Sequence, residues 1–469
     1  MIDLWPFQAD LIQKLRQSLL SRHIAPLLVS PTGSGKTVMF AYLVGKLSTA
    51  GKRTVILAHR KELLGQISKT LKMFRVKHDL IAPKSIYNSH YPTHVASVFS
   101  VVRKLDYIKV PDYVIIDEAH HAIPGSTWNK TLDHWRQANP NLRIIGVTAT
   151  PERLSGEGLS HTFDTMVMGP SVAELIESRH LSPYKMFAPP RQVDTSSLHR
   201  RMGDFAKGEA AALMDKPTIT GDAVAHYRKH LNGAPTIGFT VSVEHAYHVA
   251  ETYRANGFSA ATLEGKVTSL ERDRIVKDFS RGAINYLSTC DLVSEGFDVP
   301  GAIGCQNLRP TESLAMCLQQ WGRVLRYQNG KTAIILDHVG NSARHGLPDE
   351  DRSWSLEGIS KGKRKNGDPD DIQIRQCGRC GAVNPASSRN CSECGTEFKI
   401  KPRKVAEVEG TLEEIRAHEK QKYMETAQYQ KRLSYLIQLG HKRNYKSPER
   451  WAAHVMNGSV DKMMKQRVR

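Results

Sequence analysis

The sequence predicts two tandem α/β domains, each a doubly wound parallel sheet, followed by a small cysteine-rich module and a basic helical tail. Three observations lead to this prediction. Short apolar runs rich in β-branched residues alternate with helical stretches, and they do so in two successive series. The runs are continuously apolar rather than alternating, as is typical of strands buried on both faces of a parallel sheet. Past residue 361 the apolar runs stop and the density of charge rises.

The first series predicts a domain over residues 1–150. A helix is expected from Pro6 to about Leu20, because proline suits a first helical turn and the apolar residues that follow recur at helical spacing. The strands expected after it are Pro26–Val29, Thr54–Leu57, Val95–Val98, Tyr113–Ile116 and Leu142–Val147.

The second series predicts a domain over residues 234–345. Its expected strands are Thr236–Phe239, Ala260–Leu263, Tyr286–Ser288, Gly301–Gln306 and Thr332–Leu336. Residues 151–233, which contain turn clusters and prolines, are expected to form a connecting or accessory segment.

The C-terminal part is expected to form three further segments. Residues 346–374 are predicted to be a charged linker, residues 375–400 a cysteine-rich ribbon, and residues 401–469 a basic helical tail. A capping box over residues 411–414 predicts a long helix that runs toward Gly440, and Ser447-Pro448 predicts the start of a last short helix.

The charge and the apolar content of the sequence indicate what kind of partner the protein binds. The net charge is +19 and the pI is near 9.6, which favours a polyanionic partner. Residues 361–469 carry 24 Lys and Arg against 13 Asp and Glu, over half of the net charge. No apolar run approaches the ~18 residues of a membrane span, so no membrane partner is expected. Cys290, Cys305 and Cys317 lie in apolar surroundings, as buried thiols do in a reducing cytoplasm.

A glycine-rich loop joins the first strand to a helical run. Its sequence, Ser30–Thr37, is a variant P-loop, with Ser30 where the strict pattern has glycine. Glycines let the backbone turn tightly so that its N–H groups face an anion, and the helix that follows adds its positive dipole. Lys36 can reach the β- and γ-phosphates of ATP, and the Thr37 hydroxyl can ligate Mg²⁺. The residues expected against the phosphates are Pro31, Thr32, Gly33, Ser34, Gly35, Lys36 and Thr37.

Two adjacent carboxylates follow the strand Tyr113–Ile116, in the run Asp117-Glu118-Ala119-His120. The carboxyl ends of parallel strands are where α/β sheets bind ligands. Asp117 is therefore expected to hold Mg²⁺ through water, and Glu118 to orient and deprotonate the water that attacks the γ-phosphate.

Two arginines lie three residues apart in Gln319–Arg326, so that on a helix they share one face. Presented across a cleft, Arg323 and Arg326 can act as arginine fingers on the γ-phosphate.

Four cysteines near the C-terminus are spaced as C-x₂-C, ten residues, C-x₂-C. This spacing predicts a tetrahedral, structural Zn²⁺ site, with disulfides as the alternative. The expected ligands are Cys377, Cys380, Cys391 and Cys394.

Together these motifs resemble the superfamily 2 helicases of the DEAD/DEAH-box and type III restriction-subunit group. The likeness is greatest to the RadD-type DNA repair helicases and their phage-borne relatives, over roughly residues 1–345. The resemblance implies two RecA-like domains that close and open as ATP is hydrolysed. It also implies that Phe7 and Gln8 bind the adenine, that Gln319 assists catalysis and that Gly296 and Asp298 lie near the nucleotide. The residues that it implies along the nucleic acid are Arg60, Thr148, Thr240 and Thr289.

The sequence therefore predicts an ATP-dependent helicase or translocase of the bacterial or phage-infected cytoplasm. The expected substrate is single-stranded, forked or branched DNA, in repair, recombination or replication. An RNA helicase, a duplex translocase that does not separate strands and a zinc-bearing nucleic-acid-binding protein without catalysis are the alternatives. The C-terminal region is a candidate for binding a partner protein.

Overall fold

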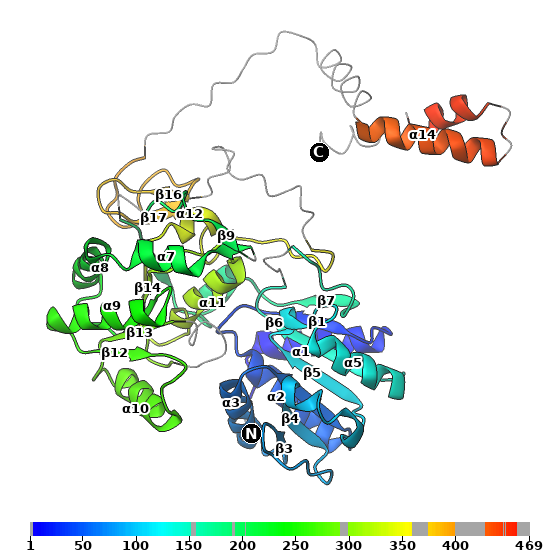
Figure 1. The fold of residues 1–469 in the computed structure, drawn as a ribbon, viewed down its shortest axis with the longest axis horizontal. Helices are drawn as coiled ribbons and strands as arrows, with labels where there is room; N and C mark the ends of the chain where they lie inside the picture. Colours follow the sequence, from blue (N-terminus) through cyan, green and yellow to red (C-terminus); the bar gives the residue numbers. More distant parts are fainter. Residues whose placement is uncertain are drawn as a thin grey trace. The chain divides into compact units, whose positions relative to one another are not determined.

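The computed structural model describes residues 3–151, 156–189, 193–201, 203–290, 299–358, 374–398, 427–443, 445 and 447–456 (Figure 1). The chain divides into two compact units, Met1–Lys399 and Ile400–Arg469. The described part of the first unit contains two parallel sheets and two short antiparallel pairs of strands, and that of the second contains helices.

The first sheet has seven parallel strands in the order β3-β4-β2-β5-β6-β1-β7. Its strands are β1 (Pro26–Val29), β2 (Thr54–Ala58), β3 (Asp79–Ile81), β4 (Thr93–Ser97), β5 (Tyr113–Asp117), β6 (Arg143–Thr148) and β7 (Thr165–Met168). Its helices are α1 (Pro6–Leu20), α2 (Lys36–Thr49), α3 (Lys61–Met73), α4 (Val98–Val101) and α5 (Thr127–Ala138), with 3₁₀ turns η1 (Leu105–Tyr107) and η2 (Ala119–His121).

Both faces of this sheet are covered. Leu28 and Ile56 pack with α1, α2 and α3, whereas Leu27 and Val55, their neighbours along the strands, pack with α4 and α5. Because successive side chains of a strand point to opposite faces, this accounts for the continuously apolar runs in the sequence.

The second sheet has six parallel strands in the order β12-β13-β11-β14-β15-β8. Its strands are β8 (Tyr184–Phe187), β11 (Thr236–Phe239), β12 (Ala260–Leu263), β13 (Tyr286–Thr289), β14 (Gly304–Asn307) and β15 (Ala333–Asp337). The helices of this part are α6 (Val172–Glu177), α7 (Lys207–Met214), α8 (Pro217–His230), α9 (Val243–Ala255), α10 (Ser269–Ser280), α11 (Leu314–Val324) and α12 (Asn341–His345). A small hairpin is formed by β9 (Arg200–Arg201) and β10 (Asp204–Phe205).

The segment 151–233, expected to connect the domains, instead contributes to both sheets. Strand β7 pairs with β1 at the edge of the first sheet, and β8 pairs with β15 at the edge of the second. Helix α8 starts at Pro217 and packs on the second sheet through Val224 and Tyr227. Both strands are short edge strands with partly exposed side chains, so their apolar signal in the sequence is weak.

The first half of the expected linker, residues 347–358, crosses from the second sheet back to the first (yellow after α12 in Figure 1). Leu347 lies in a core of the second domain, whereas Trp354 and Leu356 pack on a core of the first. The Leu356 carbonyl accepts hydrogen bonds from the N–H groups of Leu159 and Ser160. The two domains are therefore joined twice, by residues 169–183 and by this crossing segment, 347–358.

The cysteine-rich ribbon is docked on the edge of the second sheet. Its strands, β16 (Ile374–Gln376) and β17 (Val383–Pro385), are antiparallel. An antiparallel bridge joins Phe187 of β8 to Ala382, and the Gln376 side-chain amide donates to the Ala188 carbonyl at 2.5 Å. The ribbon therefore covers the edge of β8, which would otherwise be open.

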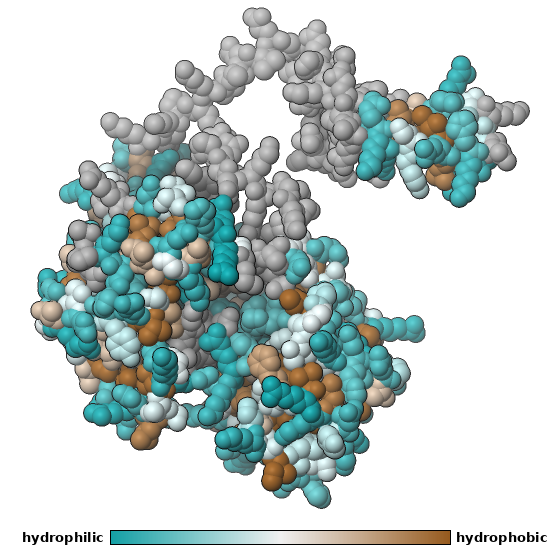
Figure 2. All heavy atoms as spheres, in the orientation of Figure 1, coloured by the Kyte–Doolittle hydropathy of each residue, from teal (hydrophilic) through white to brown (hydrophobic). Residues whose placement is uncertain are grey.

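The second unit contains α14 (Ala427–Lys442) and a helix over residues 448–456. Tyr429 and Met456 form its small core with Leu433 and Leu436. The capping box over residues 411–414 lies outside the described residues. Figure 2 shows hydrophilic residues over much of the visible face, with the apolar ones in separate groups. Within the described part of the chain, no helix combines the length and apolarity needed to cross a membrane.

Candidate active site

The P-loop forms the tight turn that its sequence predicts. Gly33 and Gly35 have φ angles of +91° and +80°, in the left-handed region that glycine adopts without strain. The loop leads directly into α2, which begins at Lys36. Lys36 Nζ donates to the carbonyls of Ser30 and Pro31, each at 3.2 Å, so the lysine lies along its own loop.

The departure of the loop from the strict pattern has a structural reason. Ser30 is fully buried, and its hydroxyl donates to the Ser34 hydroxyl at 2.7 Å. This hydrogen bond joins the start of the loop to its middle. A glycine in place of Ser30 has no side chain to make it.

Gln8 of α1 is fixed to the same loop. Its amide nitrogen donates to the Ser34 carbonyl at 2.9 Å, and its amide oxygen accepts from the Trp5 N–H at 3.0 Å. Phe7 and Trp5 lie beside His180, with ring centroids 4.9 and 4.8 Å from that imidazole. Phe7 also packs on a core of the second domain, so this aromatic cluster links the domains next to the P-loop.

The two carboxylates lie at the carboxyl end of β5, opposite Lys36. Burial raises the pKa of Asp117 to about 7, with the charge of Glu118 adding to the shift and that of Lys36 opposing it. Burial lowers the pKa of Lys36, against the charges of Glu118 and Asp117. Glu118 has a φ of +53°, a left-handed conformation that costs a non-glycine residue roughly 1 kcal/mol or more. Buried charge and backbone strain at one point are typical of a catalytic site.

His120, for which the sequence predicts no role, connects this carboxylate to β6. Its Nδ1 lies 3.5 Å from Glu118 Oε2 and 3.2 Å from the Thr148 hydroxyl. The Thr148 hydroxyl donates to the Thr150 carbonyl at 3.0 Å. These contacts link the Glu118 carboxylate to the strand end that leads out of the first domain.

Helix α11 of the second domain completes the site. Gln319 Nε2 lies 3.5 Å from Glu118 Oε2, and Arg323 is almost fully buried. Burial lowers the pKa of Arg326 to about 10. The charges of both arginines contribute to the lowered pKa of Lys36, which is the electrostatic sign that they face the P-loop.

Gly322 allows this close approach. A Cβ at that position would stand 2.4 Å from the Thr32 side chain, so any larger residue would push α11 away from the P-loop. No glycine requirement was predicted here, because it depends on a contact between segments almost 300 residues apart in the sequence.

The remaining predicted site residues differ in their burial and contacts, and two of them lie outside the described residues. Arg60 precedes α3, and its Nε donates to His59 at 3.2 Å. Thr148, Thr240 and Thr289 are buried, and their hydroxyls donate to backbone carbonyls. In this conformation the three hydroxyls help to hold the ends of their strands in place. Gly296 and Asp298 lie outside the described residues.

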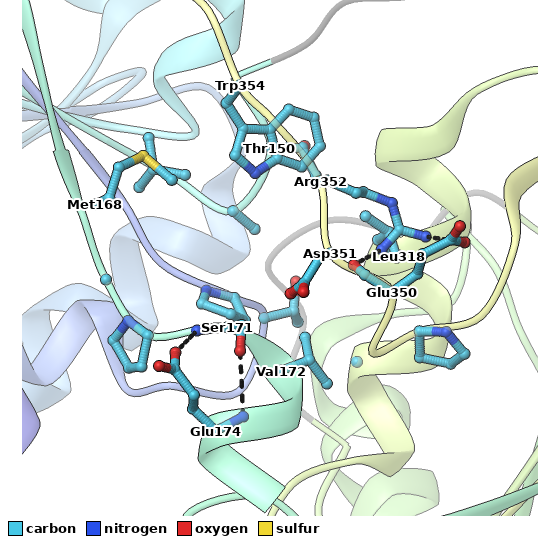
Figure 3. Close-up of a pocket in the computed structure, with 18 of the residues that line it drawn as sticks. Thr150, Met168, Ser171, Val172, Glu174, Leu318, Glu350, Asp351, Arg352 and Trp354 are labelled. Carbon is cyan, nitrogen blue, oxygen red and sulfur yellow. Dashed lines mark hydrogen bonds and ion pairs between the residues drawn. The ribbon is translucent and has the colours of Figure 1, made fainter. Parts of the chain in front are cut away.

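A cavity of about 360 Å³ lies beside the P-loop, between α6, α11 and the crossing segment (Figure 3). Trp354 and Arg352 of the crossing segment line it, together with Thr150 and Leu318 from the two domains. Arg352 donates to the carbonyls of residues 345, 347 and 350, which fixes this wall to the second domain. The cavity was not predicted, because the crossing segment was expected to be a linker.

The four cysteines come together as predicted. Their Sγ atoms lie within 4.8 Å of one another, with Cys377–Cys394 and Cys380–Cys391 each at 3.6 Å. A disulfide would need about 2.0 Å, whereas four thiolates around Zn²⁺ lie about 3.8 Å apart. The donor set therefore fits a tetrahedral zinc ion and excludes the disulfide alternative in this structure.

The comparisons with known proteins agree with this geometry. Residues 1–153 match the family model of the type III restriction enzyme res subunit, and residues 219–328 match that of the helicase conserved C-terminal domain. A 51.5 kDa protein of a Lactococcus phage is 35% identical over 377 residues, which are 80% of this chain and 79% of the phage protein.

A putative ATP-dependent helicase of Saccharomyces cerevisiae, IRC3, is 29% identical over 66% of this chain and 48% of its own length. The chain thus spans about half of that yeast relative. Among solved structures, a fragment of a putative HsdR subunit of a type I restriction enzyme from Vibrio vulnificus has the same fold. Its TM-score is 0.57 at 21% identity, over 72% of this chain and 65% of that one.

A P-loop, two buried carboxylates and two arginines from a second parallel-sheet domain thus meet in one site, and both matched family models and the yeast relative carry restriction-subunit or helicase names. The chain belongs to the superfamily 2 helicases of the type III restriction res-subunit group, enzymes that hydrolyse ATP.

Proposed function

We propose that this helicase acts on DNA, coupling ATP hydrolysis between its two RecA-like domains to movement on, or remodelling of, single-stranded, forked or branched DNA. The observation that carries the proposal is the approach of Gln319, Arg323 and Arg326 to Glu118 and the P-loop. A site shared by two domains is completed or broken as they move, so hydrolysis and domain motion are coupled. The net charge of +19 and the match to a restriction-enzyme subunit support DNA as the polyanion.

The roles of the residues follow from their chemistry. Lys36 and the loop N–H groups bind the phosphates, and Thr37 and Asp117 are the residues that would hold Mg²⁺. When bound, Mg²⁺ neutralises charge on the phosphate oxygens. Glu118 takes the proton of the attacking water, while Arg323 and Arg326 stabilise the charge that develops on the γ-phosphate.

The other contacts of the proposal lie around this centre. We assign the adenine to Phe7 and Gln8, beside the aromatic cluster of Trp5 and His180. Gly296 and Asp298 are assigned to the nucleotide, and Arg60 to the DNA strand. The ribbon holds a structural Zn²⁺, because its four thiolates leave no open coordination position.

The first experiment is steady-state ATP hydrolysis, alone and with single-stranded DNA, duplex DNA, forked DNA and RNA, at two salt concentrations. We expect stimulation by DNA that weakens as salt rises, because phosphate contacts release counterions. The Glu118→Gln variant is the control, and it should lose the stimulated activity while still binding ATP.

The other outcomes separate the alternatives. Stimulation by RNA alone would favour an RNA helicase; the Escherichia coli relative named ATP-dependent RNA helicase SrmB is 24% identical over 66% of this chain. Stimulation by duplex DNA without strand separation would favour a translocase. Absence of nucleic-acid stimulation under every condition would contradict the proposal.

A further inference from the structure

A second cavity, of about 90 Å³, lies where the ribbon meets the second domain. Its walls come from the end of β8, from α8, from β15 and from the first cysteine knuckle. None of the residues assigned to ATP or to catalysis lines it.

The charged side chains that line this cavity are all basic. Lys229 of α8 and Arg379 of the knuckle line it, together with the imidazoles of His226, His230 and His338. No carboxylate is among the described lining residues. An acidic side chain near His230, that of Glu393, accepts a hydrogen bond from Lys185 at 2.7 Å.

Two of the imidazoles have a ring nitrogen that makes no hydrogen bond to the described part of the chain. Gln306 accepts from two tyrosine hydroxyls through its amide oxygen, so its amide nitrogen must donate to the Ala223 carbonyl and to His338 Nε2. His338 therefore accepts at Nε2 and carries its proton on Nδ1, which makes that nitrogen a donor. His226 Nδ1 is buried and has no hydrogen-bond partner within the described part of the chain.

The walls are held rigidly against each other. The Ala188 N–H donates to the Gly381 carbonyl at 3.0 Å, and the Gly381 N–H donates to the Cys377 carbonyl at 2.9 Å. Gly381 has a φ of +78°, and a Cβ there would stand 2.9 Å from the Ala188 carbonyl oxygen. The position of the knuckle that carries Arg379 is thus fixed relative to the end of β8.

A metal ion does not fit the imidazole cluster. In the parts of the chain that the structure describes, the four ribbon cysteines are the one group whose ligand atoms lie close enough together for a metal. Two cationic groups and the Nδ1–H donor of His338 around a small cavity are instead the chemistry that binds a phosphate.

We propose that this cavity, formed jointly by the ribbon and the second domain, binds a phosphate group of a nucleic acid strand. An inorganic phosphate has the same chemistry as a phosphate group of a nucleic acid strand. The choice of the nucleic acid as the ligand therefore rests on the proposed function. Such a site gives the ribbon a second role besides holding zinc. The ribbon would bind the nucleic acid strand together with the second domain, and without the first.

The test uses the full chain with zinc bound and compares Arg379→Ala/Lys229→Ala with a charge-matched control, Arg389→Ala/Lys52→Ala. Arg389 is exposed on the same ribbon but does not line the cavity, and Lys52 is exposed at the amino end of β2. Binding of a labelled single-stranded oligonucleotide is measured by fluorescence anisotropy across a range of salt concentrations.

We expect the cavity variant to bind about 3- to 10-fold more weakly than the control. The slope of log K against log salt should become shallower by about 0.7 for each phosphate that the variant no longer neutralises. Zinc content, melting temperature and ATP hydrolysis without nucleic acid should be the same in both variants. An affinity and a slope equal to those of the control would overturn the proposal.

A second measurement separates the two sources of phosphate and also separates this inference from the proposed function. Thermal stabilisation by inorganic phosphate is recorded with the ATP site filled by ADP. Stabilisation that the cavity variant loses, together with an unchanged oligonucleotide slope, would overturn the nucleic-acid assignment in favour of free phosphate. If the unaltered protein binds no oligonucleotide, the proposed function fails, and loss or retention of this stabilisation alone decides whether the cavity binds phosphate.

Discussion

The two parallel-sheet domains place polar residues at the same position, the carboxyl ends of their strands, but use them differently. In the first domain, Asp117 and Glu118 are buried with few internal partners, and the backbone of Glu118 is strained. In the second domain, Asp337 accepts four hydrogen bonds from the backbone and side chain of the turn that follows it. The first domain keeps its polar groups for a ligand, whereas the second uses them to hold its own structure.

Asn307, at the end of β14, is a second polar residue that hydrogen-bonds within the second domain, and its partners lie on α11. Its amide nitrogen donates to Gln320 and its amide oxygen accepts from the Trp321 indole, both at 2.8 Å. These two residues lie between Gln319 and Arg323 on α11, and Gln319 contacts Glu118 of the first domain. The internal hydrogen bonds of the second domain therefore hold α11 in position. The following variants test this difference between the polar groups of the two domains.

The largest effect is expected from Glu118→Gln. Loss of the general base should lower kcat for ATP about 10³-fold, within the range for such residues. Binding of ATP, followed with a fluorescent analogue, should persist, because Lys36 and the loop are intact. A variant that still hydrolyses ATP within tenfold of the unaltered protein would show that another group takes the proton.

Gly322→Ala should rank second. The added Cβ would meet Thr32 at 2.4 Å and displace α11 from the P-loop, and a misplacement of about 1 Å can cost roughly 10²-fold in kcat. The melting temperature should hardly change, because the contact joins two domains and lies in neither core.

The matched control for Gly322→Ala is Gly65→Ala in α3, where nothing lies within 4 Å of the added atom. This variant should keep full activity and gain roughly 0.5–1 kcal/mol of helix stability. Equal activity of both variants would contradict the close approach of α11.

Asn307→Ala should affect both stability and activity. It leaves the Trp321 indole N–H and the side-chain amide oxygen of Gln320 buried without their Asn307 partner, which costs about 2–3 kcal/mol in the free energy of unfolding. Because α11 is then no longer held by Asn307, kcat should also fall about tenfold, measured beside urea denaturation. A drop in stability with unchanged kcat would mean that α11 is positioned by other contacts.

The smallest effect concerns pH. The pKa of Asp117 is raised to about 7, so below that pH a proton competes with Mg²⁺ for the carboxylate. The Mg²⁺ concentration needed for half-maximal ATP hydrolysis should therefore rise several-fold from pH 7.5 to 6, and stay nearly constant above pH 8. An equal Mg²⁺ requirement at all these values would argue that Asp117 does not meet the ion.

Local patterns in the sequence predicted most of the fold and of the ATP site. The P-loop, the Asp117-Glu118 pair and the arginines of α11 each carry their chemistry within a few neighbouring residues, and their strands are continuously apolar. The structure brings these segments to one place, and the four cysteines to another.

What the sequence did not predict depends on contacts between distant segments. Gly322 matters because of Thr32, and Ser30 because of Ser34. The edge strands β7 and β8 are too short and too exposed to give a clear apolar run. Thr148, Thr240 and Thr289 have the residue type of a nucleic-acid contact, but their burial was not readable from the chain.

The crossing segment has a consequence for how the protein is made. Trp354 and Leu356 pack on the core of the first domain, yet they follow the last strand of the second domain in the chain. During synthesis from the N-terminus, the ribosome must produce nearly all of the second domain before these two residues can pack on the first. Domains usually fold one after another as they emerge. Here the first domain gains part of its packing only from a segment that follows the second, and a fragment ending near residue 170 would expose an apolar surface that the intact protein covers.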